Sequence, residues 1–162
     1  MAKLKKLIRY VVLALLSSLI FRGGICWPIS IIVTGNWYET IDASDLQAGA
    51  GSDLISTYES ASDTVSIDIS STAGNWGLDV KKVDDNWHSN LHLHAKRASD
   101  GTGSGTISGG DAYQEVTDTD LSFFSGSEDR SNVNVQLRLT GVSIQVPPDA
   151  YTATVYYTVS DQ

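Results

Sequence analysis

Strict alternation of apolar and polar residues is the clearest pattern in this chain, and it is strongest at the C-terminal end. From Tyr151 to Val159 the sequence reads YTATVYYTV, so Tyr, Ala and Val fall on one side of an extended chain and mostly Thr on the other. Because successive side chains of a strand point to opposite faces, this period predicts a half-buried β-strand. Pro147 and Pro148 precede it and predict a turn, since neither can donate to a sheet ladder.

The same period of two recurs through most of the chain after residue 26, between segments rich in Gly, Ser, Asp and Asn. It predicts strands within residues 29–41, 54–60, 65–70, 76–80, 91–95, 113–117, 121–124, 133–139 and 142–146. No segment there shows the 3.6-residue spacing of an amphipathic helix. The sequence therefore predicts an all-β fold, a single immunoglobulin-like antiparallel β-sandwich over residues 27–162.

The first 26 residues differ from all that follows. Four basic residues lie within the first nine positions and precede the apolar run YVVLALLSSLIF. A basic start, a short apolar stretch and small residues behind it are typical of a secretory signal peptide, and the run is shorter than a membrane span of about 20 residues. We expect residues 1–26 to be a signal peptide and the protein to be secreted, extracellular or at the cell surface. An uncleaved anchor is the alternative, because residues 27–33 are also apolar.

Removal of residues 1–26 leaves a strongly acidic chain. All 19 Asp and Glu lie after residue 26 but only six of the 11 Lys and Arg do, so the formal charge changes from −8 to −13. Such a surface repels phosphate backbones and anionic lipid, so we expect no nucleic-acid partner and no membrane contact after signal removal. Cys26, the only cysteine, leaves with the signal, and the domain is predicted to have no disulfide.

The histidines come closest to a chemical site. In WHSNLHLH, His92 and His94 share one face of a predicted strand, whereas Leu91 and Leu93 claim the core-facing side. No Cys, Asp or Glu accompanies them at ligand spacing, so solvated histidines are favoured over a metal site. Trp87 is the best candidate for an exposed aromatic that stacks on sugar rings, with packing against the sandwich edge as the alternative. The candidate ligand contacts are therefore Trp87, His92 and His94, and no metal site is predicted.

No arrangement for catalysis can be read from the sequence, and we expect the protein not to be an enzyme. The stretch Gly103-Ser104-Gly105 lies within residues 98–110, which contain five glycines in 13 positions and predict a flexible loop that fixes no nucleophile. Acidic clusters at residues 84–86 and 128–129 leave calcium as an alternative to the expected absence of a cofactor, although both lack the alternating acids of a calcium loop.

The C-terminal strand resembles the last strand of secreted bacterial pilin-like sandwiches, such as the spore coat protein U and chaperone–usher groups. The resemblance rests on Pro147-Pro148-Asp149-Ala150-Tyr151 followed by alternating Thr, Val and Tyr, and it covers residues 143–162 and the general strand plan. The chain is also similar to acidic secreted β-domains of bacteria and archaea. In the pilins a neighbour's N-terminal strand completes an open sandwich, so the resemblance implies assembly into filaments.

Residues 27–35 contain the candidate donor strand. Ile29, Ile31 and Val33 alternate along it, and Gly35-Asn36 follows as a candidate hinge. If these three side chains filled a neighbour's groove, subunits would link head to tail into a homopolymer. The alternative is one continuous strand over residues 29–41 within its own domain.

The function expected from these features is that of a secreted structural or adhesive surface subunit, which binds its own copies or other surface proteins. The alternative is a monomeric module that binds an extracellular carbohydrate or another ligand. It would use Trp87, the histidine strand and the glycine-rich segment.

Overall fold

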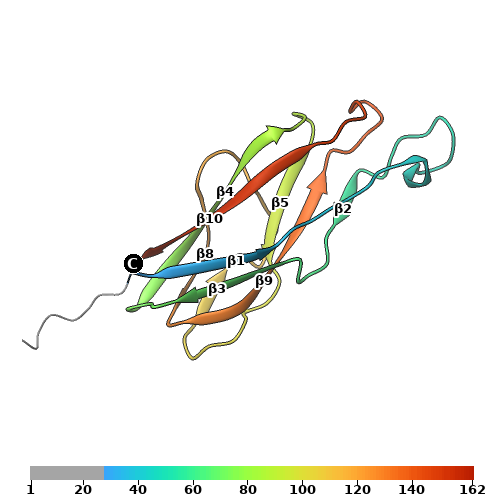
Figure 1. Cartoon of the computed structure of the whole chain (residues 1–162). Coiled ribbons are helices and arrows are strands. Elements are labelled where there is room, and N and C mark those ends of the chain that lie inside the picture. Colours follow the sequence, from blue (N-terminus) through green and yellow to red (C-terminus); the bar gives the residue numbers. More distant parts are fainter. Residues whose placement is uncertain (1–27) are drawn as a thin grey trace, which may run out of the picture.

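Ten strands form two antiparallel sheets in the computed structural model, which describes residues 28–162 (Figure 1). They are β1 (Ser30–Gly35), β2 (Thr57–Glu59), β3 (Val65–Ser70), β4 (Asn75–Asn86), β5 (His92–Arg97), β6 (Ile107–Gly109), β7 (Gln114–Glu115), β8 (Leu121–Ser127), β9 (Arg130–Thr140) and β10 (Thr152–Asp161). The first sheet has the order β1-β3-β9-β5-β7, with β2 also paired to β9, and the second has the order β10-β4-β8-β6.

The two sheets pack against each other, which confirms the prediction of an all-β sandwich. The predicted signal peptide, residues 1–26, lies outside the described residues. In the part of the chain that is described, no helix is long and apolar enough to cross a membrane.

The core lies between the inner faces of the central strands. Its largest fully enclosed side chains are Ile67, Ile69, Trp76, Leu78, Val80, Val116, Val133 and Val135. The Trp76 ring meets Phe124 edge-on at 6.1 Å, and its Nε1 donates to the Glu128 carbonyl at 2.9 Å. Because burying a large apolar side chain contributes about 1.5–3 kcal/mol, β3, β4 and β9 are the most firmly held part of the fold.

The first strand is shorter than its alternation predicts. β1 ends at Gly35, whose φ of 124° lies in the left-handed region, and a side chain there would collide with the backbone oxygen of Thr64. The alternative of one continuous strand over residues 29–41 is therefore wrong in its extent, although β1 does pair within its own domain. Residues 36–56 instead project beyond the sandwich and include the short turn η1 (Ala43–Asp45) before the chain returns at β2 (Figure 1).

The glycine-rich segment is more regular than its composition predicts. It contains β6, which pairs with β8, and its Thr102 exchanges two backbone hydrogen bonds with Ser131. A side chain at Gly105 would collide with the carbonyl of Ser127, so this glycine permits close backbone packing. The prediction of a loop throughout residues 98–110 is thus wrong at β6.

The segment between β9 and β10 also departs from its pattern. The alternation of Val142, Ile144 and Val146 predicts a strand, but these residues form a turn in which the Val146 amide donates to the Ser143 carbonyl. Gly141, with a φ of 82°, ends the ladder before them. Only Val142 is buried, whereas Ile144 is 61% exposed.

Candidate assembly edges and ligand-contact residues

The two sheets end on strands from the two ends of the described chain. β1 forms one edge of the first sheet and β10 one edge of the second, and each has a single ladder partner, β3 and β4 respectively. The two edges lie on the same side of the sandwich, where they approach each other as β10 ends and diverge towards its start (Figure 1). An edge strand leaves N–H and C=O groups free to pair with another chain. These edges are therefore candidate assembly surfaces.

β1 is joined to the domain mainly through its backbone. Its six residues pair with all six residues of β3, yet none of its side chains is fully buried. Two of the predicted donor residues, Ile29 and Ile31, pack partly buried against the core, whereas Val33 is 40% exposed and its neighbour Ile32 is 57% exposed. In the single chain the donor residues thus cover their own core, and donation to a neighbour requires β1 to separate from β3.

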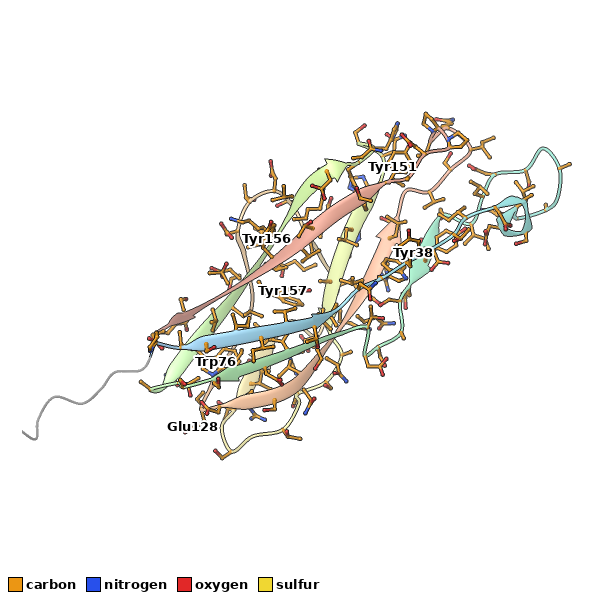
Figure 2. All side chains as sticks on the ribbon, in the orientation of Figure 1. Tyr38, Trp76, Glu128, Tyr151, Tyr156 and Tyr157 are labelled. Carbon is orange, nitrogen blue, oxygen red and sulfur yellow. The ribbon has the colours of Figure 1, made fainter. Side chains whose placement is uncertain are left out.

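β10 is longer and better anchored. It pairs with β4 along all ten of its residues, and Val155, Tyr157 and Val159 pack inward against the core. Figure 2 shows Tyr156 and Tyr157 on opposite sides of the strand, and Tyr156 is 49% exposed. Residues 152–160 contain no charged side chain and no proline. The free edge of β10 therefore lacks the residues that commonly prevent pairing with another chain.

The inward Tyr157 carries an unpaired hydroxyl. Its oxygen is buried and has no hydrogen-bond partner among the described residues, while its ring lies 6.5 Å from that of Phe123. Burial raises the pKa of Tyr157 above the ordinary value for tyrosine, because the phenolate would lose its hydration. An unpaired buried hydroxyl costs about 1–3 kcal/mol, so Tyr157 stabilises the sandwich through its ring alone.

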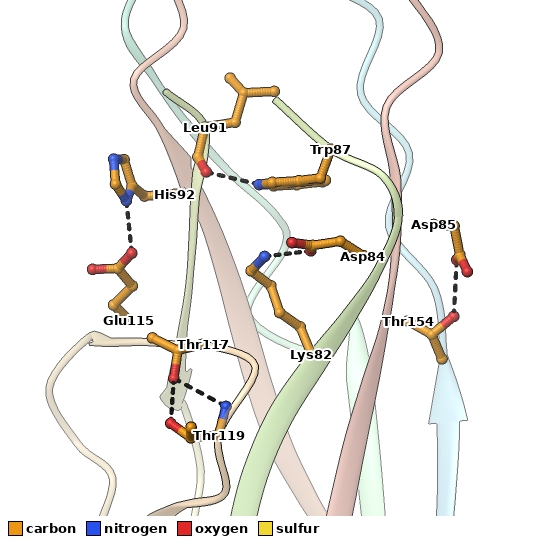
Figure 3. Close-up of polar contacts among 10 residues, drawn as sticks. All are labelled: Lys82, Asp84, Asp85, Trp87, Leu91, His92, Glu115, Thr117, Thr119 and Thr154. Atoms are coloured by element: carbon orange, nitrogen blue, oxygen red, sulfur yellow. Dashed lines mark hydrogen bonds and ion pairs between the residues drawn. The ribbon is translucent and has the colours of Figure 1, made fainter. Parts of the chain in front are cut away.

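Both candidate histidines lie on the outer face of β5, as the buried Leu91 and Leu93 require. His92 is exposed and its Nδ1 lies 2.6 Å from Oε1 of Glu115 (Figure 3). This hydrogen bond lowers the pKa of the Glu115 carboxyl. His94 is half-buried, and its Nδ1 has no partner in residues 28–162. The histidines therefore share a face but not a common partner.

A second group on the same outer face was invisible in the sequence. Cζ of Arg138 on β9 lies 3.5 Å from the ring centroid of Tyr113, and Nζ of Lys96 on β5 lies 4.5 Å from the same centroid. Arg138 also pairs with Glu59 on β2, with 2.6 Å between Nη2 and Oε1, and its hydrogen bond lowers the pKa of Glu59. The register of β5 against β9 sets His94 opposite Arg138, and this pairing brings together segments that are distant in the sequence.

Trp87 folds back onto the end of the sandwich. Its Nε1 donates to the Leu91 carbonyl at 2.7 Å, and Nζ of Lys82 lies 5.2 Å from its ring (Figure 3). Lys82 is buried and forms an ion pair with Asp84, so the chain itself covers one face of the indole. Figure 3 shows the indole and the His92 ring on either side of the chain at Leu91. The structure does not gather the three candidate ligand contacts into one surface.

Three of the four carboxylates in the acidic clusters considered for calcium have partners within the chain. Asp84 binds Lys82, Asp85 accepts from Oγ1 of Thr154 at 3.3 Å, and Asp129 accepts from the amide and hydroxyl of Thr72 at 3.0 and 2.9 Å. Within residues 28–162, no three His, Cys, Asp or Glu side chains lie close enough together to hold a metal ion.

No protein-family model matches the chain, and no curated protein or solved structure matches it either. The two edge strands and the outer face of the first sheet are the features of the described chain that bear on its function.

Proposed function

We propose that this protein is an extracellular structural subunit that assembles with its own copies by exchanging β1. The observation that carries the proposal is that β1 pairs with β3 along its whole length, while Ile31 is the one side chain of the strand that packs against the core. An identical strand from a neighbour would form the same hydrogen bonds and cover the same part of the core. Each subunit would receive one strand and give its own to the next, which makes a head-to-tail homopolymer.

The connection behind β1 suits such an exchange. Residues 36–56 contain no ladder strand, only η1 and the isolated bridge between Leu46 and Leu54. An extended chain spans about 3.3 Å per residue, so this segment is long enough to carry β1 to an adjacent domain.

Disulfide trapping tests whether β1 pairs with its own β3 or with that of a neighbour. Thr34 and Ser66 face each other in the ladder. Opposed residues of antiparallel strands lie about 4.5–5.5 Å apart at Cα, within the range of a disulfide. Chains with Cys26→Ser and either Thr34→Cys or Ser66→Cys are mixed in urea, refolded together and oxidised. Exchange predicts a disulfide between the two different chains, and the double variant gives a ladder of covalent oligomers on a non-reducing gel.

The matched control is the pairing of β10 with β4, which we expect to stay within one chain. Thr158 and Asp79 face each other between β10 and β4. Chains with Thr158→Cys and chains with Asp79→Cys, mixed in the same way, should form no disulfide with each other, whereas the double variant should close one internally. If the β1 pair behaves like this control, with internal disulfides only, β1 is not exchanged and the proposal is wrong.

A second candidate function, an extracellular ligand-binding module, is favoured by the outer face of the first sheet. His92, His94, Lys96 and Arg138 lie there on adjacent strands of a chain whose net charge is −8. Glu115 and Glu59 pair with His92 and Arg138, so Lys96 is the cation of this group that best suits an anionic ligand such as a uronic-acid polysaccharide. Retention on immobilised alginate should fall with Lys96→Ala and stay unchanged with Lys81→Ala on the other sheet. Equal retention of both variants would exclude this face as the binding site.

A further inference from the structure

β10 is the longest edge strand of the described chain. It has ten residues, compared with six in β1, three in β6 and two in β7. Its inward side chains pack against the core and hold the strand in place. The backbone N–H and C=O groups on its unpaired edge are therefore free to pair with another strand. β1 belongs to the other sheet, so its exchange does not pair with this edge, although β1 approaches β10 where β10 ends.

The sequence of β10 is self-complementary about Tyr156. An identical antiparallel strand with Tyr156 opposite Tyr156 gives the pairs Thr154–Thr158, Thr152–Ser160, Val155–Tyr157 and Ala153–Val159. Every pair joins residues of the same face, hydroxyl with hydroxyl outside and apolar with apolar inside, which are favourable cross-strand neighbours. A register centred on Tyr157 would instead set Asp161 opposite Ala153. The pattern therefore selects Tyr156 as the centre.

We propose that two copies of this chain pair through their β10 edges about a two-fold axis at Tyr156. The two four-stranded second sheets would then join into one sheet of eight strands. This contact is isologous, with the same surface on both chains, so it closes at two copies. It differs in this respect from β1 exchange, which continues from subunit to subunit, and it does not depend on that exchange.

The charge distribution supports β10 as the place where two acidic copies meet. Residues 152–160 carry no charge, although the residues after position 26 carry −13 in total. Repulsion between the remaining surfaces opposes the contact, and salt screens that repulsion. The dimer should therefore become tighter as the ionic strength rises, whereas an association held by ion pairs would become weaker.

Single-cysteine variants, all carrying Cys26→Ser, test the register. Tyr156→Cys sits on the axis and should form a disulfide-linked dimer on oxidation. Ser160→Cys should not link to itself, because the two copies lie about 27 Å apart at eight residues of strand spacing. Ser160→Cys mixed with Thr152→Cys should form the mixed disulfide. The proposal would be overturned if the Tyr156→Cys variant stayed monomeric on oxidation. It would also be overturned if Ser160→Cys linked to itself as efficiently as Tyr156→Cys does.

Charge variants test the contact without cysteine chemistry. Tyr156→Asp sets two like charges opposite each other and should weaken the dimer by about tenfold or more in sedimentation velocity. Ser108→Asp adds the same charge to exposed β6 at the other edge of this sheet and should leave the dimer intact. Tyr156→Asp should not change the interchain disulfide between Thr34→Cys and Ser66→Cys, so failure of either assembly mode is seen separately. A single-chain mass for the wild-type protein at all concentrations and salt levels would exclude the two-fold dimer.

Discussion

β1 and β10 are both edge strands with complete ladders, yet they are tied to the sandwich in different ways. Neither strand has a fully buried residue, but β1 packs only Ile31 against the core, whereas β10 packs Val155, Tyr157 and Val159 there. Backbone bonds can be formed equally well by an identical strand from another chain, but a set of packed side chains must first leave its site. The number of side chains packed against the core, and not the ladder, therefore distinguishes the edge that we expect to exchange from the edge that we expect to stay.

The largest expected effect comes from removing the central side chain of each edge strand. Tyr157→Ala should lower the free energy of unfolding by about 3 kcal/mol, because it empties space next to the buried Phe123. Ile31→Ala should lower it by about 1 kcal/mol, since this side chain is only partly buried. Urea unfolding measures both losses. Equal losses would mean that β1 is as firmly anchored as β10, and the contrast between the edges would fail.

A smaller change in stability should distinguish the β1–β3 pairing from the β10–β4 pairing. Gly35→Ala places a side chain at a left-handed φ of 124° and against the backbone at Thr64, which should cost more than about 1 kcal/mol locally. We expect faster hydrogen exchange of the β1–β3 amides and unchanged exchange of the β10–β4 amides. Faster exchange in both ladders would show that β1 does not open independently of the rest of the sandwich.

Removing the hydroxyl of Tyr157 should raise the free energy of unfolding and not lower it. Tyr157→Phe removes a buried unpaired oxygen and should raise the free energy of unfolding by about 1 kcal/mol at neutral pH. Burial raises the pKa of Tyr157 above its ordinary 10.0, so the wild-type stability is fully present below that value and falls as the pH rises above it.

Tyr157→Phe should therefore gain most at alkaline pH, as urea unfolding at about pH 7 and about pH 11 can show. Tyr58 and Tyr113 also have raised pKa values, mainly through burial, so part of the alkaline loss should remain in the variant. A variant less stable than wild type at both values would mean that the hydroxyl has a partner in solution.

The sequence predicts the sandwich well because burial on one face imposes a period of two on every long strand. β3, β5 and β10 follow that period almost to their ends. The prediction fails where backbone geometry overrides the pattern, as at Gly35, whose left-handed φ ends β1, and at Gly141, which turns residues 142–146 out of the ladder. Periodicity reports which side chains face inward, but not where a strand stops.

The candidate site was predictable only in part, for a related reason. Alternation places His92 and His94 on an outer face and Tyr157 on an inner one, because each assignment needs only neighbouring residues. The contacts of Arg138 and Lys96 with the Tyr113 ring depend on the register of β9 against β5, which no local pattern contains. Trp87 was ambiguous because its turn allows either exposure or packing, and the hydrogen bond to Leu91 decides for packing.

The smallest expected effect lies on the outer face of β5 and belongs to neither edge. An ionised carboxylate only accepts hydrogen bonds, so Nδ1 of His92 donates to Glu115 and lowers the pKa of its carboxyl. A lowered pKa stabilises the fold above the ordinary value of 4.5 and ceases to do so as the pH falls through the folded value. His92→Ala should return the pKa of Glu115 towards 4.5 in an NMR titration.

Because both side chains are 47% exposed, this change should scarcely alter the stability at neutral pH. It should also leave unchanged the interchain disulfide between Thr34→Cys and Ser66→Cys and the dimer formed through β10. Neither β1 nor β10 pairs with β5, which carries His92. A variant that altered either assembly mode would show that the outer face of the first sheet communicates with an edge. The two edges would then not be independent surfaces. The difference between them would depend on the whole sheet and not on how many side chains each strand packs against the core.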